Sequence, residues 1–108
     1  MAEHLEADQV NALDDAYTVA RQARVCLGGG PQDLMILEEC AEAIEALSAL
    51  QIAVAKRLNH RGLRGKVDEE LADALLTVLG AMPADSEAWV WLRGKTERLG
   101  RRIAEVSR

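Results

Sequence analysis

Aromatic residues are scarce in this sequence, which has no phenylalanine, one tyrosine and two tryptophans. The β-branched residues are sparse and scattered, whereas alanine and leucine, both strong helix formers, supply most of the hydrophobic content. A β-sheet is therefore not expected. Hydrophobic residues still make up 49% of the 108 residues, too many for a disordered chain. We expect a single all-α domain over residues 1–108.

Long apolar runs are also missing from the sequence. Every stretch without a charged residue is shorter than the roughly 20 apolar residues of a membrane-spanning helix, so no membrane span is expected. The first ten residues carry acidic side chains and no apolar run, which predicts no signal peptide. Cys26 and Cys40 lack the spacing of a metal site. We interpret them as reduced thiols of a cytoplasmic protein.

Basic residues are outnumbered, because 18 acidic residues against 13 basic ones give a net charge of −5. This balance disfavours non-specific binding to nucleic acid by the chain as a whole. The charges alternate in blocks: residues 1–15 hold five acids and no Lys or Arg, residues 56–66 hold five bases and no acid, and the segment from Arg93 onward is basic again. Such an alternation suits a site that holds both a cation and a polyanion.

Hydrophobic periodicity and helix breakers predict four helices, at about residues 5–25, 31–58 and 67–81, and from Asp85 or Ser86 nearly to the end. Gly28–Gly30 is predicted to be a turn, with Pro31 at the first position of the second helix. Residues 59–66, with two glycines and no apolar period, are predicted to be a loop. The second helix is apolar around most of its circumference. We therefore expect a four-helix bundle completed by a second subunit, in a homodimer or homotetramer.

The second predicted helix nevertheless carries one charged arc, about 120° wide, made of Glu38, Glu39, Glu42 and Glu45. Within it Glu39 and Glu42 are i,i+3 neighbours, and Glu70 and Asp73 repeat this spacing on the third helix. Like charges at this spacing repel unless a cation lies between them. Carboxylates with no His or Cys nearby are hard oxygen donors, which suit Mg²⁺ or Mn²⁺ rather than zinc. The alternative interpretation is that these acids form a solvated helix face.

Residues 37–46 read Leu-Glu-Glu-Cys-Ala-Glu-Ala-Ile-Glu-Ala, and residues 69–75 read Glu-Glu-Leu-Ala-Asp-Ala-Leu. This double acidic motif resembles the EExxE…ExxD signature of the MazG-like nucleoside triphosphate pyrophosphohydrolases. The 27 residues between Glu42 and Glu70 fit the separation that the family tolerates. Residues 95–99, Lys-Thr-Glu-Arg-Leu, resemble the Lys-x-x-Arg-Leu of short phage and bacterial members. The resemblance covers about residues 31–102.

The resemblance implies an all-α, oligomeric enzyme that uses Mg²⁺ to hydrolyse (deoxy)nucleoside triphosphates to the monophosphate and pyrophosphate. Carried over by position, the metal ligands are Glu39, Glu42, Glu70 and Asp73. Glu38 is then a candidate base, and the catalytic carboxylates are Glu38, Glu39 and Glu42. The preferred base and sugar are not implied, because the first helix lacks the Trp or Phe that many members place near the base.

A triphosphate also needs positive side chains for the phosphates that a metal does not cover. The candidates lie in the last predicted helix and in the predicted loop before the third: Lys95, Arg98, Lys66 and Arg64. A bound cation would lower the pKa of a water that attacks the α-phosphate. No Ser or Cys has a base partner in the sequence, so nucleophilic catalysis by the protein has no support.

Three functions remain open from the sequence. The first is the metal-dependent pyrophosphohydrolase, and the second is a helical interaction or regulatory module with a weak or inactive site on the same fold. The third is a small helical regulator that binds nucleic acid through its basic tail, Arg101, Arg102 and Arg108. The complete set of four carboxylates favours the first over the second. The acidic balance and the lack of a helix-turn-helix pattern disfavour the third.

Overall fold

The computed structural model describes residues 3–107, which form four α-helices: α1 (Ala7–Leu27), α2 (Gly29–Ala55), α3 (Arg61–Gly80) and α4 (Ala88–Val106). No strand occurs in this range, so the predicted all-α class is confirmed. Arg108, which the sequence places in the basic tail, lies outside the described residues. None of the four helices is long and apolar enough to cross a membrane, as far as residues 3–107 show.

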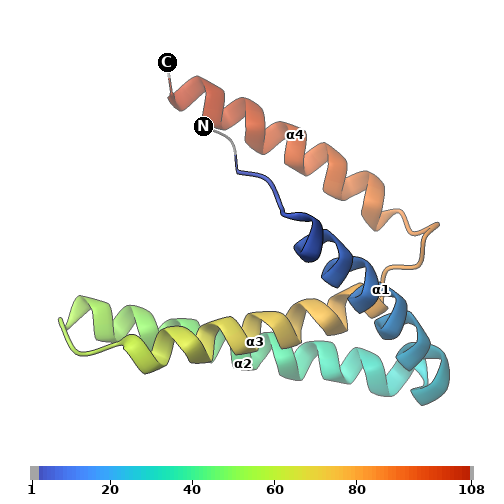
Figure 1. Ribbon diagram of the computed structural model, residues 1–108, viewed down its shortest axis with the longest axis horizontal. Helices are drawn as coiled ribbons and strands as arrows, with labels where there is room; N and C mark the ends of the chain where they lie inside the picture. The colour runs from blue at the N-terminus through green and yellow to red at the C-terminus, as the bar shows by residue number, and fades with distance from the viewer. Residues whose placement is uncertain (1–2, 108) are drawn as a thin grey trace.

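The helices α2 and α3 form an antiparallel pair that packs side by side, and α1 crosses this pair at one end (Figure 1). From the end of α3 the chain turns into α4, which lies apart from the α2–α3 pair. Within the described part of the chain, only the first turn of α4 touches another helix, where Trp89 packs on Tyr17 of α1, and the rest of α4 packs against none of the other three helices. One chain therefore packs three helices and leaves the fourth separate. Completion of a four-helix bundle by a second subunit stays a prediction.

The hydrophobic core of the single chain is thin. Its buried apolar residues are Ala20, Ala43, Leu50, Ala53, Val67 and Leu79. The radius of gyration is 16.7 Å, whereas a globular domain of this length has about 13 Å. Large apolar side chains of α2 stay outside, such as Leu37 and Ile44, which are 68% and 67% exposed. The chain alone therefore leaves much of its hydrophobic content in water.

The contact between α1 and the end of α3 is close and specific. A Cβ on Gly80 would lie 3.0 Å from the carbonyl oxygen of Ala20. The guanidinium of Arg21 donates a hydrogen bond to the carbonyl of Gly80, and the hydroxyl of Tyr17 donates one to the carbonyl of Met82 at 2.9 Å. These contacts fix the point at which the chain leaves α3.

The loop predicted over residues 59–66 is wrong for most of its length, because α3 begins at Arg61. The turn lies earlier, where Arg57 adopts a left-handed conformation with φ of 57°. The side-chain oxygen of Asn59 then accepts a hydrogen bond from the backbone N–H of Arg61 at 3.2 Å and helps to start the helix. Two glycines in a helix cost only about 1 kcal/mol each, which packing can offset. Lys66 is consequently a helical residue, not a loop residue.

Two other boundaries also differ from the sequence prediction. The turn predicted over three glycines is confined to Gly28, whose φ is 93°, and α2 begins at Gly29. Pro31 is therefore the third helical residue, where its missing N–H still costs no intrahelical hydrogen bond. The residue that precedes α4 is Glu87, although the hydroxyl of Ser86 accepts a hydrogen bond from the N–H of Ala88 at 3.1 Å.

Candidate functional site

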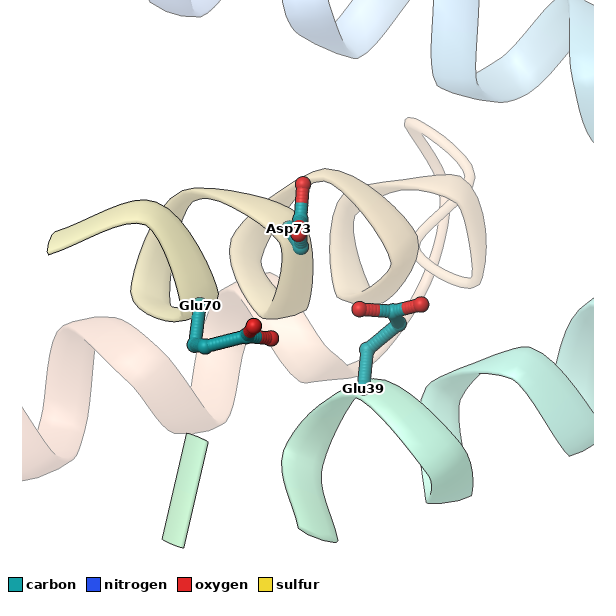
Figure 2. Close-up of side chains that lie close together, drawn as sticks. All are labelled: Glu39, Glu70 and Asp73. Atoms are coloured by element: carbon teal, nitrogen blue, oxygen red, sulfur yellow. The ribbon is translucent and has the colours of Figure 1, made fainter. Parts of the chain in front are cut away.

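Three carboxylates meet between α2 and α3, and we call Glu39, Glu70 and Asp73 the acidic cluster. One oxygen of each lies within 4.8 Å of the others. Glu39 comes from α2, and Glu70 and Asp73 come from successive turns of α3. Figure 2 shows the carboxylates of Glu39 and Glu70 in the space between the two helices. The structure thus brings together three of the four carboxylates that the sequence names as metal ligands.

Packing of the two helices explains why these side chains converge. Ala43 lies one turn after Glu39 on α2, and Val67 lies one turn before Glu70 on α3. Both Ala43 and Val67 are buried, so these faces of α2 and α3 point into the packed interior. Residues three or four apart share a helix face, and the acids are therefore directed into the same interface.

The acidic cluster contains carboxylate oxygens that are buried and unsatisfied. Glu70 is only 4% exposed, and it is the one buried charged residue in the described range. The Oε2 atoms of both Glu39 and Glu70 are buried and have no hydrogen-bond partner among residues 3–107. A buried polar atom without a partner destabilises the fold, and a buried negative charge does so more strongly. A cation bound between these oxygens would remove that penalty.

Lys66 partly compensates the negative charge. Glu70 follows Lys66 by one turn of α3, and the Nζ atom of Lys66 lies 2.6 Å from Oε1 of Glu70. The hydrogen bond from Lys66 holds the pKa of Glu70 below its ordinary value, although burial acts in the opposite direction. In return, Glu70 raises the pKa of Lys66. Because the Lys66 side chain is 56% exposed, this ion pair alone adds little stability.

Glu42, the fourth predicted ligand, lies one turn after Glu39 on α2 and is exposed. Repulsion from Glu39 raises the pKa of Glu42, and the neighbouring Glu70 adds to the rise. Glu42 also borders an open pocket of about 360 Å³, lined by Glu42, Glu45, Ala46, Ala49, Leu63, Lys66 and Glu70. The pocket therefore joins carboxylates, one ammonium group and an apolar wall directly beside the acidic cluster.

The remaining predicted site residues lie elsewhere. Glu38 is exposed on α2 and is not part of the acidic cluster. Lys95 and Arg98 are on α4, which contacts neither α2 nor α3 in the described chain (Figure 1). Arg64 is exposed on α3. Of the predicted phosphate-binding residues, the structure of one chain places only Lys66 at the acidic site.

The apolar wall of the pocket was not predicted from the sequence. On α2 it follows the helical period, because Ala46 and Ala49 continue the face of Glu42 by four and seven residues. The helical period alone could therefore have identified these two alanines. Leu63 could not be found in the same way, because the segment that carries it was predicted to be a loop and is in fact the first turn of α3.

None of the protein families, curated proteins or solved structures compared with this chain matches it. Function is therefore inferred from the residues of this chain and their arrangement.

Proposed function

We propose that this protein is a Mg²⁺-dependent pyrophosphohydrolase of the MazG-like type, which converts (deoxy)nucleoside triphosphates to the monophosphate and pyrophosphate. One observation supports the proposal most strongly. Glu39 and Glu70 each hold a buried carboxylate oxygen with no hydrogen-bond partner among residues 3–107, close to Asp73, and Glu70 also lines a pocket together with Lys66. All three carboxylates of the acidic cluster belong to the double acidic motif on which the resemblance rests.

The donor set fits a hard divalent cation. The acidic cluster offers carboxylate oxygens and, among the described residues, no His or Cys belongs to it. Oxygen-only ligands are typical of Mg²⁺ and Mn²⁺ sites, and Glu42 is the adjacent carboxylate that would add a fourth ligand. A cation held there would supply positive charge for the polyphosphate and lower the pKa of a bound water.

The side chains around the pocket have separate tasks in this proposal. The ammonium group of Lys66 lines the pocket and would bind a phosphate oxygen of the substrate. Glu38, the candidate base, lies next to Glu39 on α2 but outside the acidic cluster. It would accept a proton from the attacking water, while Glu42 would serve as a metal ligand. The pocket, at about 360 Å³, lies within the range of small-molecule sites.

We further propose that the protein is a cytoplasmic homodimer or homotetramer, with a subunit contact made largely of Ala, Leu and Ile side chains of α1 and α2. The exposure of Leu37 and Ile44 supports such a contact. Lys95 and Arg98 lie on α4, apart from the acidic site in one chain, so phosphate binding in this proposal falls to Lys66.

The reaction itself provides the test. The protein is incubated with Mg²⁺ and a panel of (d)NTPs, and pyrophosphate and orthophosphate are measured separately. We expect pyrophosphate from at least one substrate, and a loss of nearly all turnover in Glu39→Ala and Glu70→Ala with helical content unchanged. Asp68→Ala is the matched control, because it removes an exposed carboxylate of α3 that is not part of the acidic cluster. We expect this variant to keep its activity.

Other outcomes would contradict the proposal. Orthophosphate as the product would show cleavage at a different bond, and turnover unaffected by Glu39→Ala and Glu70→Ala would place the chemistry elsewhere. A folded protein that binds Mg²⁺ but releases no product from any (d)NTP would favour the interaction module instead.

A further inference from the structure

The helix α4 has an apolar side that nothing in the described chain covers. Leu92, Leu99 and Ile103 lie within one narrow stripe when residues are placed at 100° intervals, and they are 52%, 55% and 57% exposed. Thr96 lies on the same stripe and is exposed as well. Among residues 3–107, α4 packs on no other helix beyond its first turn. A stripe of this kind is typical of a helix that packs against another one.

The start of α4 is nevertheless held firmly against α1. The indole N–H of Trp89 donates a hydrogen bond to the carbonyl of Pro83 at 2.9 Å. The ring of Trp89 packs edge-to-face on Tyr17, with 5.9 Å between centroids. Since Tyr17 also donates to Met82, the connection between α3 and α4 is tied to α1 at both of its ends. These contacts set the direction of α4, and the helix then diverges from α1 and α3 (Figure 1).

The divergence leaves a wide apolar groove between α4 and the rest of the chain. Its volume is about 740 Å³, and it is lined by Val10, Leu13, Asp14, Tyr17, Leu75, Val78, Leu79, Met82, Ala84, Trp89 and Leu92. On the α1 and α3 walls Val10, Leu13 and Leu75 are 51%, 40% and 51% exposed. The chain therefore presents an apolar groove and, beside it, an apolar helix.

The groove and the α4 helix also carry opposite charges. Lys95, Arg98 and Arg102 form a basic flank along one side of the stripe, at 100° per residue. The groove is bordered by Asp14, the one charged residue of its lining, and Asp14 forms no ion pair within the described residues. The N-terminal block that contains Asp14, residues 1–15, holds five acids and no Lys or Arg.

We propose that the occupant of this groove is α4 of a second copy of the chain, inserted reciprocally across a two-fold axis. Reciprocal insertion is self-consistent, because each copy supplies both the groove and the helix that fills it. The apolar stripe meets the apolar walls, and the basic flank meets the acidic half of α1. The chain's own α4 cannot serve, because the contacts of Trp89 and Tyr17 hold its first turn at the rim. This interface is separate from the exposed face of α2 and does not depend on catalysis.

Sedimentation equilibrium on the full chain tests the proposal. We expect Leu99→Arg to weaken self-association at least tenfold, lowering the mass from dimer to monomer, or from tetramer to dimer where the α2 face also pairs. Val90→Arg is the matched control, because Val90 is 73% exposed on the opposite side of α4. This variant should associate like the wild type. Neither variant disturbs a helix contact of the single chain, so circular dichroism should show unchanged helicity for both. A monomeric wild type, or equal behaviour of the two variants, would overturn the proposal.

Chemical cross-linking between two marked chains then identifies the contacting elements. In a background with Cys26→Ser and Cys40→Ser, one chain carries Val10→Cys and the other carries Leu99→Cys. A short bismaleimide should join the two different chains in a mixture, and should do so far less when Val90→Cys replaces Leu99→Cys. Equal yields from positions 99 and 90 would contradict insertion of α4 into the partner's groove.

Discussion

A carboxylate as buried as Glu70, at 4% exposure, keeps its charge in a folded protein only when partners offset the loss of water. Lys66 provides one such partner, and its hydrogen bond lowers the pKa of Glu70. The second oxygen of Glu70 and one oxygen of Glu39 have no hydrogen-bond partner in the described chain. At the scale of single residues, the acidic cluster therefore has the features expected of a cation site.

This leads to a prediction about metal-linked stability. In metal-free buffer Asp73→Asn should melt at least as high as the wild type, because it removes a repelling charge. Glu70→Gln should melt no higher than the wild type, because it also removes the charged partner of Lys66, which lowers the pKa of Glu70. Mg²⁺ or Mn²⁺ should raise the melting temperature of the wild type through binding to the folded state, and both variants should lose most of that rise. Thermal melts with and without metal measure both effects. If the variants respond to Mg²⁺ as strongly as the wild type, the acidic cluster is not a metal site.

The raised pKa of Glu42 predicts a pH dependence of stability. Repulsion from Glu39 puts the pKa in the folded protein above the ordinary value of 4.5, so ionising Glu42 destabilises the fold as pH rises through the raised pKa. Glu42→Gln should therefore melt higher than the wild type near neutral pH without metal, and the difference should shrink as pH falls toward 4.5. Glu38→Gln, an exposed change on the same helix, is the control. A difference between Glu42→Gln and wild type that grows on acidification would contradict the placement of Glu42 beside Glu39.

At the scale of helices, the close approach of α1 and α3 predicts opposite effects for two glycines of α3. Gly80→Ala should destabilise the protein by about 1–3 kcal/mol, because the added Cβ would lie 3.0 Å from the backbone oxygen of Ala20. Gly65 has nothing within 4 Å of its missing Cβ, so Gly65→Ala should stabilise by up to about 1 kcal/mol. Denaturant unfolding measures both. A stabilising Gly80→Ala would mean that the two helices pack less closely than described.

The helices themselves were largely predictable, because periodicity and glycine or proline breakers are local signals. The error at residues 59–66 shows the limit of such signals. Gly62 and Gly65 suggested a loop, but the hydrogen bond from the N–H of Arg61 to Asn59 and the packing of the α2–α3 pair favour a helix over them. The i,i+3 spacing of Glu39–Glu42 and Glu70–Asp73 identified faces of two helices. That the two faces meet depended on tertiary packing, for which the family resemblance was the main indication.

The position of Lys95 and Arg98 could not be predicted, for a physical reason of the same kind. A helical period reports which side of α4 is apolar, but not where the connection after α3 directs the helix. Contacts between residues far apart in sequence, such as the 2.9 Å hydrogen bond from Tyr17 to Met82, fix that direction. The sequence placed these two bases at the acidic site, whereas α4 lies apart from it in one chain.

At the scale of the molecule, the apolar side chains left exposed on α2 predict self-association. The protein should be a dimer or tetramer at micromolar concentration by light scattering. Ile44→Glu should lower the mass, because Ile44 is 67% exposed on α2 and its replacement would put a charge in the contact. Val90→Glu, a similar change on the outer side of α4, should not. A wild-type monomer at this concentration would contradict the prediction.

The central claim is that water attacks the α-phosphate of a nucleoside triphosphate at the acidic cluster, and hydrolysis in ¹⁸O-labelled water tests it most directly. With Mg²⁺ present, mass spectrometry of the products should find one ¹⁸O atom in the nucleoside monophosphate and none in the pyrophosphate. Label in the pyrophosphate would show attack at the β-phosphate and would contradict the claim. So would labelled orthophosphate, or turnover that Glu70→Ala leaves unchanged.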